Sequence, residues 1–266
     1  MNEKTPEPDP AEERGPRESG GEPSATAAEL PLRSTRCRSR FIPQAAVDFF
    51  YFQNRLYPRR AALEWVGNRY RLTETERHLL HRGVFSQRDA LRRLGLRCLG
   101  SDWRNCKLFV DGHNVQITVE SAIRGRLLLK ANDGAIRDLA GVSSNFRLSE
   151  TSEMAMDVIF RFLEEFRPQE AIFLFDAPMS HSGLLAASYR QRMKKMGIRG
   201  DAATAAVPER EFPASGCVIA SSDSAVIDRS PLWFDLGGAA MAAADLLQIT
   251  VDFSHLITAR VTEKWC

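Results

Sequence analysis

The fold is decided by the stretch KLFVDGHNV (107–115), in which a short apolar run ends in an aspartate and a second apolar segment begins. Two further runs, AIFLFD (171–176) and CVIASSD (217–223), also end in an aspartate. Helical stretches lie between them, around 149–166 and 183–196, and LWFDL (232–236) and ITVDF (249–253) are expected to supply further strands. Short buried strands that alternate with helices are typical of a mainly parallel sheet. The sequence therefore predicts an α/β domain in the C-terminal part of the chain.

Three aspartates share one position in these strands. In an open parallel sheet, ligands bind beyond the carboxyl ends of the strands, and Asp111, Asp176 and Asp223 each stand at such an end, with Asn114 and Asp228 close behind. Clustered carboxylates repel one another, and burial makes their charge costlier, so a compensating group is needed. Mg²⁺ and Mn²⁺ prefer oxygen ligands of this kind. The sequence predicts a divalent-metal site suited to hydrolysis of phosphodiester bonds.

The same residues allow other interpretations. A single Asp or Asn after a strand often caps the next helix or forms an Asx-turn, and His113 either faces the acid site or caps a helix. A haloacid-dehalogenase phosphatase needs Asp-x-Asp, but His113 stands two residues after Asp111. The Asp-x-Asp pair of Toprim catalysis is also missing, because five positions separate Asp223 from Asp228. Neither a phosphate-binding glycine loop nor a G-x-S-x-G elbow occurs in the sequence.

The motifs VDGHNV (110–115), LFDAP (174–178) and ASSDSAVID (220–228) resemble the acidic motifs of the PIN-like and NYN nuclease superfamily. With YPRRAALEWVGNRYRLTETER (57–77), the arrangement resembles a prokaryotic family called domain of unknown function 434. In that family a helical N-terminal module precedes a PIN-like domain. The resemblance spans about residues 42 to 238.

The resemblance implies a Rossmann-like parallel sheet and Mg²⁺- or Mn²⁺-dependent cleavage of RNA or DNA. It places four aspartates at catalytic, metal-binding positions, with Asn114 as a supporting polar ligand. These aspartates are Asp111, Asp176, Asp223 and Asp228. PIN nucleases usually place a fourth acid on a helix after the first strand. Four residues compete for that position here, namely Asp138, Glu150, Glu153 and Asp157.

The N-terminal part of the chain divides by charge. Residues 1–32 carry three basic and eight acidic residues among Pro, Gly and Ser, which predicts a disordered acidic tail over residues 1–40. Residues 33–104 carry sixteen arginines, no lysine and six acids. Helical spacing and two capping signals, Thr73-x-x-Glu76 and Ser86, predict an all-helical basic module over 41–100, followed by a PIN-like domain over 105–266.

The arginines of the basic module suit nucleic acid, because the planar guanidinium donates bidentately to phosphate. Aromatic residues are interleaved with them. They lie at the helical spacing of a core, but they would also stack on the bases of single strands. These residues are Phe49, Phe50, Tyr51, Tyr57, Trp65 and Tyr70. Core packing and base stacking are therefore both open for this set.

The remaining features concern location and function class. Five cysteines without a C-x-x-C pair suit a reducing compartment, and no apolar run is long enough for a membrane span, so we expect a cytoplasmic protein. The function that the sequence favours is a Mg²⁺- or Mn²⁺-dependent nuclease, with RNA favoured over DNA as the partner. The alternatives are a non-catalytic nucleic-acid-binding protein with a PIN-like fold and a small-molecule phosphatase. The sequence gives no indication of the oligomeric state.

Overall fold

The computed structural model describes residues 40–139 and 149–258, which belong to one compact unit. The predicted tail, residues 1–40, lies outside this range apart from Arg40. The helices, in chain order, are α1 (Ile42–Asn54), α2 (Arg59–Arg69), α3 (Glu74–Gly83), α4 (Gln87–Gly95), the 3₁₀ turn η1 (Asp102–Asn105), α5 (Gly112–Ile123), α6 (Glu150–Glu165), α7 (Ser182–Met196), α8 (Pro208–Glu211), α9 (Ser224–Arg229), α10 (Leu236–Ala243) and α11 (His255–Thr258). The strands are β1 (Lys107–Asp111), β2 (Leu128–Lys130), β3 (Ile136–Asp138), β4 (Glu170–Asp176), β5 (Gly200–Ala205), β6 (Cys217–Ala220), β7 (Trp233–Phe234) and β8 (Ile249–Asp252).

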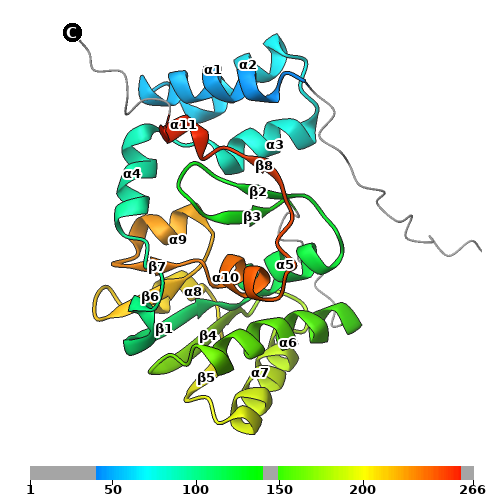
Figure 1. Cartoon of the computed structure of the whole chain (residues 1–266), viewed down its shortest axis with the longest axis vertical. Coiled ribbons are helices and arrows are strands. Elements are labelled where there is room, and N and C mark those ends of the chain that lie inside the picture. The colour runs from blue at the N-terminus through cyan, green and yellow to red at the C-terminus, as the bar shows by residue number, and fades with distance from the viewer. Residues whose placement is uncertain (1–39, 140–148, 259–266) are drawn as a thin grey trace, which may run out of the picture. The chain divides into compact units, whose positions relative to one another are not determined.

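The main sheet has five strands in the order β5-β4-β1-β6-β7. Each neighbouring pair is parallel, which confirms the predicted α/β class and the parallel sheet (Figure 1). The three apolar runs predicted as strands form β1, β4 and β6, and β1 lies between the other two. The carboxyl ends of these three strands therefore meet at one edge of the sheet.

Apolar residues cover both faces of this sheet. Alternate residues of β1 point to opposite sides: Leu108 and Val110 lie in the main core with residues of α5, α6, α7 and α10, whereas Phe109 packs with Val226 of α9 on the other side. Strands buried on both faces read as continuous apolar runs. This burial explains why the sequence shows β1, β4 and β6 clearly.

The prediction was weakest for short or edge strands. The strand GDAATA (200–205) lies at the sheet edge, is largely exposed and lacks an apolar run. The predicted strand ITVDF does form β8, but β8 pairs with β2 in a second sheet of order β3-β2-β8. The segment LWFDL contributes only Trp233 and Phe234 as β7. Asp235, expected inside that strand, is instead the N-cap of α10.

The helices α1 to α4 form the N-terminal end of the described chain (Figure 1). The predicted capping box is present, because Thr73 accepts from the Glu76 amide and Glu76 accepts from the Thr73 amide. Ser86 caps α4 as predicted. Helix α2 ends at Arg69.

The C-terminal segment returns to these helices. It runs from α10 through β8 to α11 beside the helical end (Figure 1, red). Phe253 and Leu256 are buried in the same cluster as Phe49 and Phe50 of α1. Within the described ranges, no helix combines the length and apolar character that a bilayer span requires.

Candidate active site at the carboxyl edge of the sheet

The structure places the three strand-end aspartates on one edge of the sheet. Asp111 is the last residue of β1 and pairs in register with Leu174 of β4, so Asp176 lies two residues further along the neighbouring strand. On the other side, Val110 pairs with Ala220, the last residue of β6, and Asp223 follows three residues later. These three acids, predicted to share an edge, do so.

Asp111 is the buried member of the three, with 9% of its surface exposed. Its Oδ1 caps α5 by accepting from the Asn114 amide at 3.4 Å, and its Oδ2 accepts from Ser221 Oγ at 2.8 Å. Burial raises the pKa of Asp111 to about 7, against the lowering effect of these hydrogen bonds. The negative charges of Asp176 and Asp223 also raise this pKa, so the three carboxylates act on one another electrostatically.

A glycine brings α5 close to β4 at this point. A Cβ on Gly112 would lie 2.5 Å from the ring of Phe175, which is closer than side-chain carbon atoms approach. A larger residue would push the start of α5 away from β4, and with it His113 and the cap at Asp111. The glycine in DGHNV is therefore needed for the close contact between the first helix and the second strand of the site.

Asp176 is more accessible, with 35% of its side chain exposed. Its Oδ2 lies 3.0 Å from Nδ1 of His113, and its backbone amide lies 2.9 Å from the same nitrogen. His113 itself is buried. Of the two roles left open for His113, the structure shows it facing the acid edge, in contact with Asp176.

Asp223 is the N-cap of α9. Its Oδ1 accepts from the amides of Ala225 at 2.8 Å and Val226 at 3.2 Å. No hydrogen bond or ion pair within the described residues engages its Oδ2. Asp111 and Asp223 thus combine both roles considered for them, since each caps a helix with one oxygen and stands at the strand edge.

The predicted supporting ligand, Asn114, has its side-chain oxygen engaged. Asn114 Oδ1 accepts from the Ser222 amide at 2.8 Å and from Ser222 Oγ at 3.1 Å. Ser221 Oγ donates to Asp111 and accepts from the Asp223 amide at 3.0 Å. Asn114 and the two serines therefore hold the turn after β6 against the start of α5, which fixes two of the three acids.

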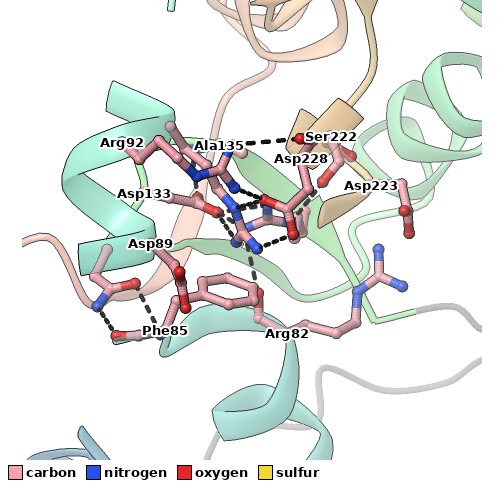
Figure 2. Close-up of polar contacts among 12 residues, drawn as sticks. Arg82, Phe85, Asp89, Arg92, Asp133, Ala135, Ser222, Asp223 and Asp228 are labelled. Atoms are coloured by element: carbon pink, nitrogen blue, oxygen red, sulfur yellow. Dashed lines mark hydrogen bonds and ion pairs between the residues drawn. The ribbon is translucent and has the colours of Figure 1, made fainter. Parts of the chain in front are cut away.

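Asp228, predicted as a fourth metal-binding acid, lies in a different environment. Its carboxylate accepts from Nε and Nη2 of Arg93 at 2.7 and 2.9 Å, and it also pairs with Arg92 (Figure 2). Burial alone would raise the pKa of Asp228, but the hydrogen bonds and charges of Arg93 and Arg92 leave it lowered. The structure does not join Asp228 to the acid edge, because two guanidinium groups of α4 already occupy its carboxylate.

Arg93 and Asp228 belong to an ion-pair cluster that we define as Arg92, Arg93, Asp133, Arg137 and Asp228. Its centre is Asp133, which is fully buried and accepts from Arg93 at 2.8 Å and from both Nη atoms of Arg137 at 2.9 and 2.8 Å. Burial raises the pKa of Asp133, but the charges and hydrogen bonds of Arg137 and Arg93 outweigh burial and lower it. This cluster joins α4, the segment before β3, and α9.

The ion-pair cluster also supports the acid edge. Arg137 Nε donates to the backbone oxygen of Ser222 at 2.6 Å, and Ser222 is the residue that binds Asn114. The turn that carries Asp223 is therefore held from both sides. The ion-pair cluster, whose charges compensate one another, therefore positions the acids of the sheet edge, whose charges are not compensated.

Sequence reasoning missed Arg82, at the end of α3. Its side chain extends toward Asp223 (Figure 2), and its buried Nε has no hydrogen-bond partner among the described residues. Burial lowers the pKa of Arg82, and the opposite charges of Asp138 and Asp223 act against that lowering. No local signal distinguishes this arginine from the others of the basic segment. Only the packing of α3 against β2 of the second sheet does.

The four candidates for the additional acid lie in different surroundings. Glu153 and Asp157 of α6 pair with Arg192 of α7, and Glu150 is exposed at the start of α6. Asp138, at the end of β3, is buried, accepts from Thr118 Oγ1 at 3.0 Å and shares Arg82 with Asp223. Asp138 is thus the candidate whose charge acts beside the acid edge.

The acids at this edge offer the type of ligand atom that a divalent cation prefers, but they do not form a complete set of metal ligands. All of their donor atoms are carboxylate oxygens, and mutual repulsion of this kind is what a hard cation relieves. In the described ranges, however, no group of three or more His, Cys, Asp or Glu side chains is arranged to hold a metal ion. Mg²⁺ is commonly bound by only one or two carboxylates, together with waters and substrate phosphates. The residues therefore fit an open Mg²⁺ or Mn²⁺ site rather than a closed cage.

Comparison with known proteins gives two family matches. The model of a domain of unknown function, DUF5616, matches residues 101–239, and that of a protein of unknown function, DUF434, matches residues 41–95. The second match confirms the resemblance of the helical segment to domain of unknown function 434. The uncharacterized protein MJ0935 of Methanocaldococcus jannaschii is 31% identical over 187 residues, which are 70% of this chain and 88% of that protein. No solved structure matches the chain.

Proposed function

We propose that this chain, which belongs to the DUF5616 family, is a divalent-metal-dependent nuclease that cleaves RNA in preference to DNA, with a PIN-like arrangement of acids. The observation that carries the proposal is the convergence of Asp111, Asp176 and Asp223 at the carboxyl edge of three adjacent parallel strands. Ligands of open α/β sheets bind at this edge. The raised pKa of Asp111 supports the proposal, because acids at functional sites are often perturbed in this way.

The three acids have distinct roles in this proposal. Asp176 and Asp223 are the more accessible carboxylates and would bind Mg²⁺ or Mn²⁺, while Asp111 behind them supplies negative charge and holds the turn after β6. Such an ion, when bound, lowers the pKa of its water and neutralises charge on phosphoryl oxygens. Asn114 acts as a positioning residue, and Asp228 is left out because of its two arginine partners.

Arg82 supplies a positive charge opposite these acids. A guanidinium donates in a planar fork that matches two oxygens of a phosphate. The Arg82 side chain reaches the acid edge from the helical segment, and its Nε is not engaged by any described residue. We assign it to the scissile or neighbouring phosphate of the substrate.

A cleavage assay tests the proposal. The full-length protein should cut an end-labelled single-stranded RNA oligonucleotide in Mn²⁺ or Mg²⁺ and not in EDTA. Asp111→Asn and Asp176→Asn should abolish cleavage, whereas Asp252→Asn, which alters an exposed acid of β8, should leave it intact. Cleavage that survives in Asp111→Asn and Asp176→Asn would refute the proposed site.

A second function is favoured by one observation. Because no group of three acids in the described part of the chain is arranged to hold a metal, a nucleic-acid-binding protein without turnover is consistent with the same fold. In that case the oligonucleotide would bind with the same affinity in Mn²⁺ and in EDTA, and no product would form.

A further inference from the structure

Helices α1 and α2 form an aromatic groove that the proposed acid site does not use. Its lining residues are Asp48, Tyr51, Phe52, Trp65, Val66 and Arg69, and its volume is about 280 Å³. Small-molecule sites are roughly 300–1,000 Å³, so the groove is suited to one flat group rather than to a large ligand. The two helices lie side by side at the N-terminal end of the described chain (Figure 1).

The groove keeps an unusual amount of aromatic surface in contact with solvent. Trp65 is 51% exposed, Tyr51 is 44% exposed and the adjacent Tyr57 is 42% exposed, whereas Phe49 and Phe50 are buried. The two interpretations of the interleaved aromatics thus apply to different residues. Phe49 and Phe50 are core, Tyr70 is half-buried, and the other three face outward.

The exposed rings are held in place by one another. Phe52 contacts the rings of Tyr51, Tyr57 and Trp65 at centroid distances of 5.9, 5.1 and 5.9 Å, and Tyr57 contacts Trp65 at 5.9 Å. The interplanar angles are 62° to 74°, so these contacts are edge to face. An edge-to-face contact covers less of the ring faces than stacking does. The groove is therefore ordered and keeps ring faces that can stack on a ligand.

Polar groups at the rim of the aromatic groove indicate which class of ligand it can bind. Asp48 accepts from the Tyr70 hydroxyl at 2.7 Å and lies 3.6 Å from Nε of Arg69, while the guanidinium of Arg55 lies over the Tyr51 ring. The rim thus presents both a carboxylate acceptor and guanidinium donors beside the aromatic rings. A nucleobase has an aromatic face together with donors and acceptors at its edge. The surrounding arginine-rich segment also complements the phosphates that flank a base.

We infer that the aromatic groove binds an unpaired base of single-stranded RNA, stacked on Trp65. The choice of RNA as the ligand rests on the proposed nuclease function, but the groove is formed by other residues than the acid edge. A duplex hides the faces of its bases, so only single strands can use the groove. The groove would thereby select unpaired substrates.

The test is oligonucleotide binding in EDTA, where no cleavage occurs. The chain has four tryptophans, of which Trp103 and Trp233 are buried and Trp265 lies outside the described residues. In full-length protein carrying Trp265→Phe, a single-stranded RNA oligonucleotide should quench tryptophan fluorescence. Trp65→Ala in the wild-type background should weaken binding of the labelled oligonucleotide by roughly tenfold, as is typical for loss of one stacked base. The slope of affinity against salt should not change, because no charge is removed.

Matched variants decide between stacking and a generic apolar contact. Trp65→Phe should restore most of the affinity and Trp65→Leu should not, because only an aromatic ring stacks on a base. Leu91→Ala, which shortens an exposed apolar side chain of α4, should bind like wild type. Unchanged affinity in Trp65→Ala, or equal affinity of the Leu and Phe variants, would overturn the inference and favour a protein partner.

The same assay separates the groove from the acid site. Asp111→Asn should retain the fluorescence quenching and the affinity, even though cleavage is lost. Quenching without any metal-dependent cleavage would support the groove and refute the nuclease. Metal-dependent cleavage together with unchanged binding in Trp65→Ala would support the nuclease and refute the groove.

Discussion

The two groups of aspartates in this protein differ in how their charge is compensated. In the ion-pair cluster, Asp133 is fully buried, yet Arg93 and Arg137 lower its pKa. At the acid edge, Asp111 is also buried, and no cationic side chain of the described residues pairs with it, so burial raises its pKa to about 7. Both groups join helices to the sheet. Two buried acids thus differ in the direction of their pKa shift according to whether arginines of the described residues supply the counter-charge.

The largest expected effect is in the compensated group. Asp133→Asn removes one of the two carboxylate partners of the buried Arg93 and the carboxylate partner of the buried Arg137, and it should lower the free energy of unfolding by about 3–5 kcal/mol. Chemical denaturation measures this change. Asp252→Asn, which weakens an exposed pair with Lys130, should cost about 1 kcal/mol or less. Equal small losses in the two variants would remove the distinction between the groups.

The opposite sign is expected at the acid edge. The folded-state pKa of Asp111 lies above the unfolded value, so its charge costs no stability below about pH 4 and the full amount above about pH 7. The rise of this pKa from its ordinary value of 3.8 to about 7 sets that amount at no more than about 4 kcal/mol. In metal-free buffer at about pH 8, Asp111→Asn should therefore be as stable as wild type or more stable, since Asn also caps helices.

The pH dependence provides the check. Wild-type stability in EDTA should fall as the pH rises from about 4 to about 7, and Asp111→Asn should lose this component of the slope. Thermal unfolding across that range measures both. A variant that is less stable than wild type at every pH would show that the Asp111 charge is compensated after all.

Arg82 extends toward Asp223, and the charge of Asp223 acts on it. Arg82→Gln should lower the rate of RNA cleavage by about 10²-fold, as expected when a donor to a reacting phosphate is removed. The variant should keep its Mn²⁺-induced rise in melting temperature, because no acid is lost. If Arg82→Gln instead lost metal binding together with cleavage, Arg82 would have to be assigned to the support of the acids.

A smaller effect is expected for Asp228. Its carboxylate is partly exposed and the buried Arg93 keeps Asp133 as a partner, so Asp228→Asn should cost roughly 1 kcal/mol. Denaturation with and without Mn²⁺ should give the same loss, and RNA cleavage should continue. A metal-dependent loss would return Asp228 to the metal site that the motif SSDSAVID suggested.

The sequence was sufficient for the parts of the site that depend on strand order. Apolar runs that end in Asp111, Asp176 and Asp223 predict a shared edge, because parallel strands place their carboxyl ends together. The caps at Thr73 and Ser86 also allowed helices of the helical segment to be predicted. These features are local, so they are encoded within a few residues of each other.

What the sequence could not show depends on contacts between distant segments. Asp228 follows Asp223 by five positions, but which of them faces α4 is decided by the turn of α9 and by Arg93, 135 positions earlier. In the sequence, nothing distinguishes Arg82 from the other arginines of its segment. Its position depends on the packing of α3 against β2 of the second sheet. Asp235 appeared to lie within a strand because the apolar run LWFDL conceals the start of α10.

Binding of Mn²⁺ tests the central claim most directly. At about pH 8, where Asp111 is ionised, a Mn²⁺ concentration of 100 times the dissociation constant should stabilise the wild-type protein by about 2.7 kcal/mol. The stabilisation should be smaller at about pH 6, because a proton must leave Asp111 before its charge can attract the cation. Asp223→Asn, which keeps the helix cap, should abolish it. Equal Mn²⁺-induced stabilisation in wild type and Asp223→Asn, or none in either, would contradict a metal site at the acid edge.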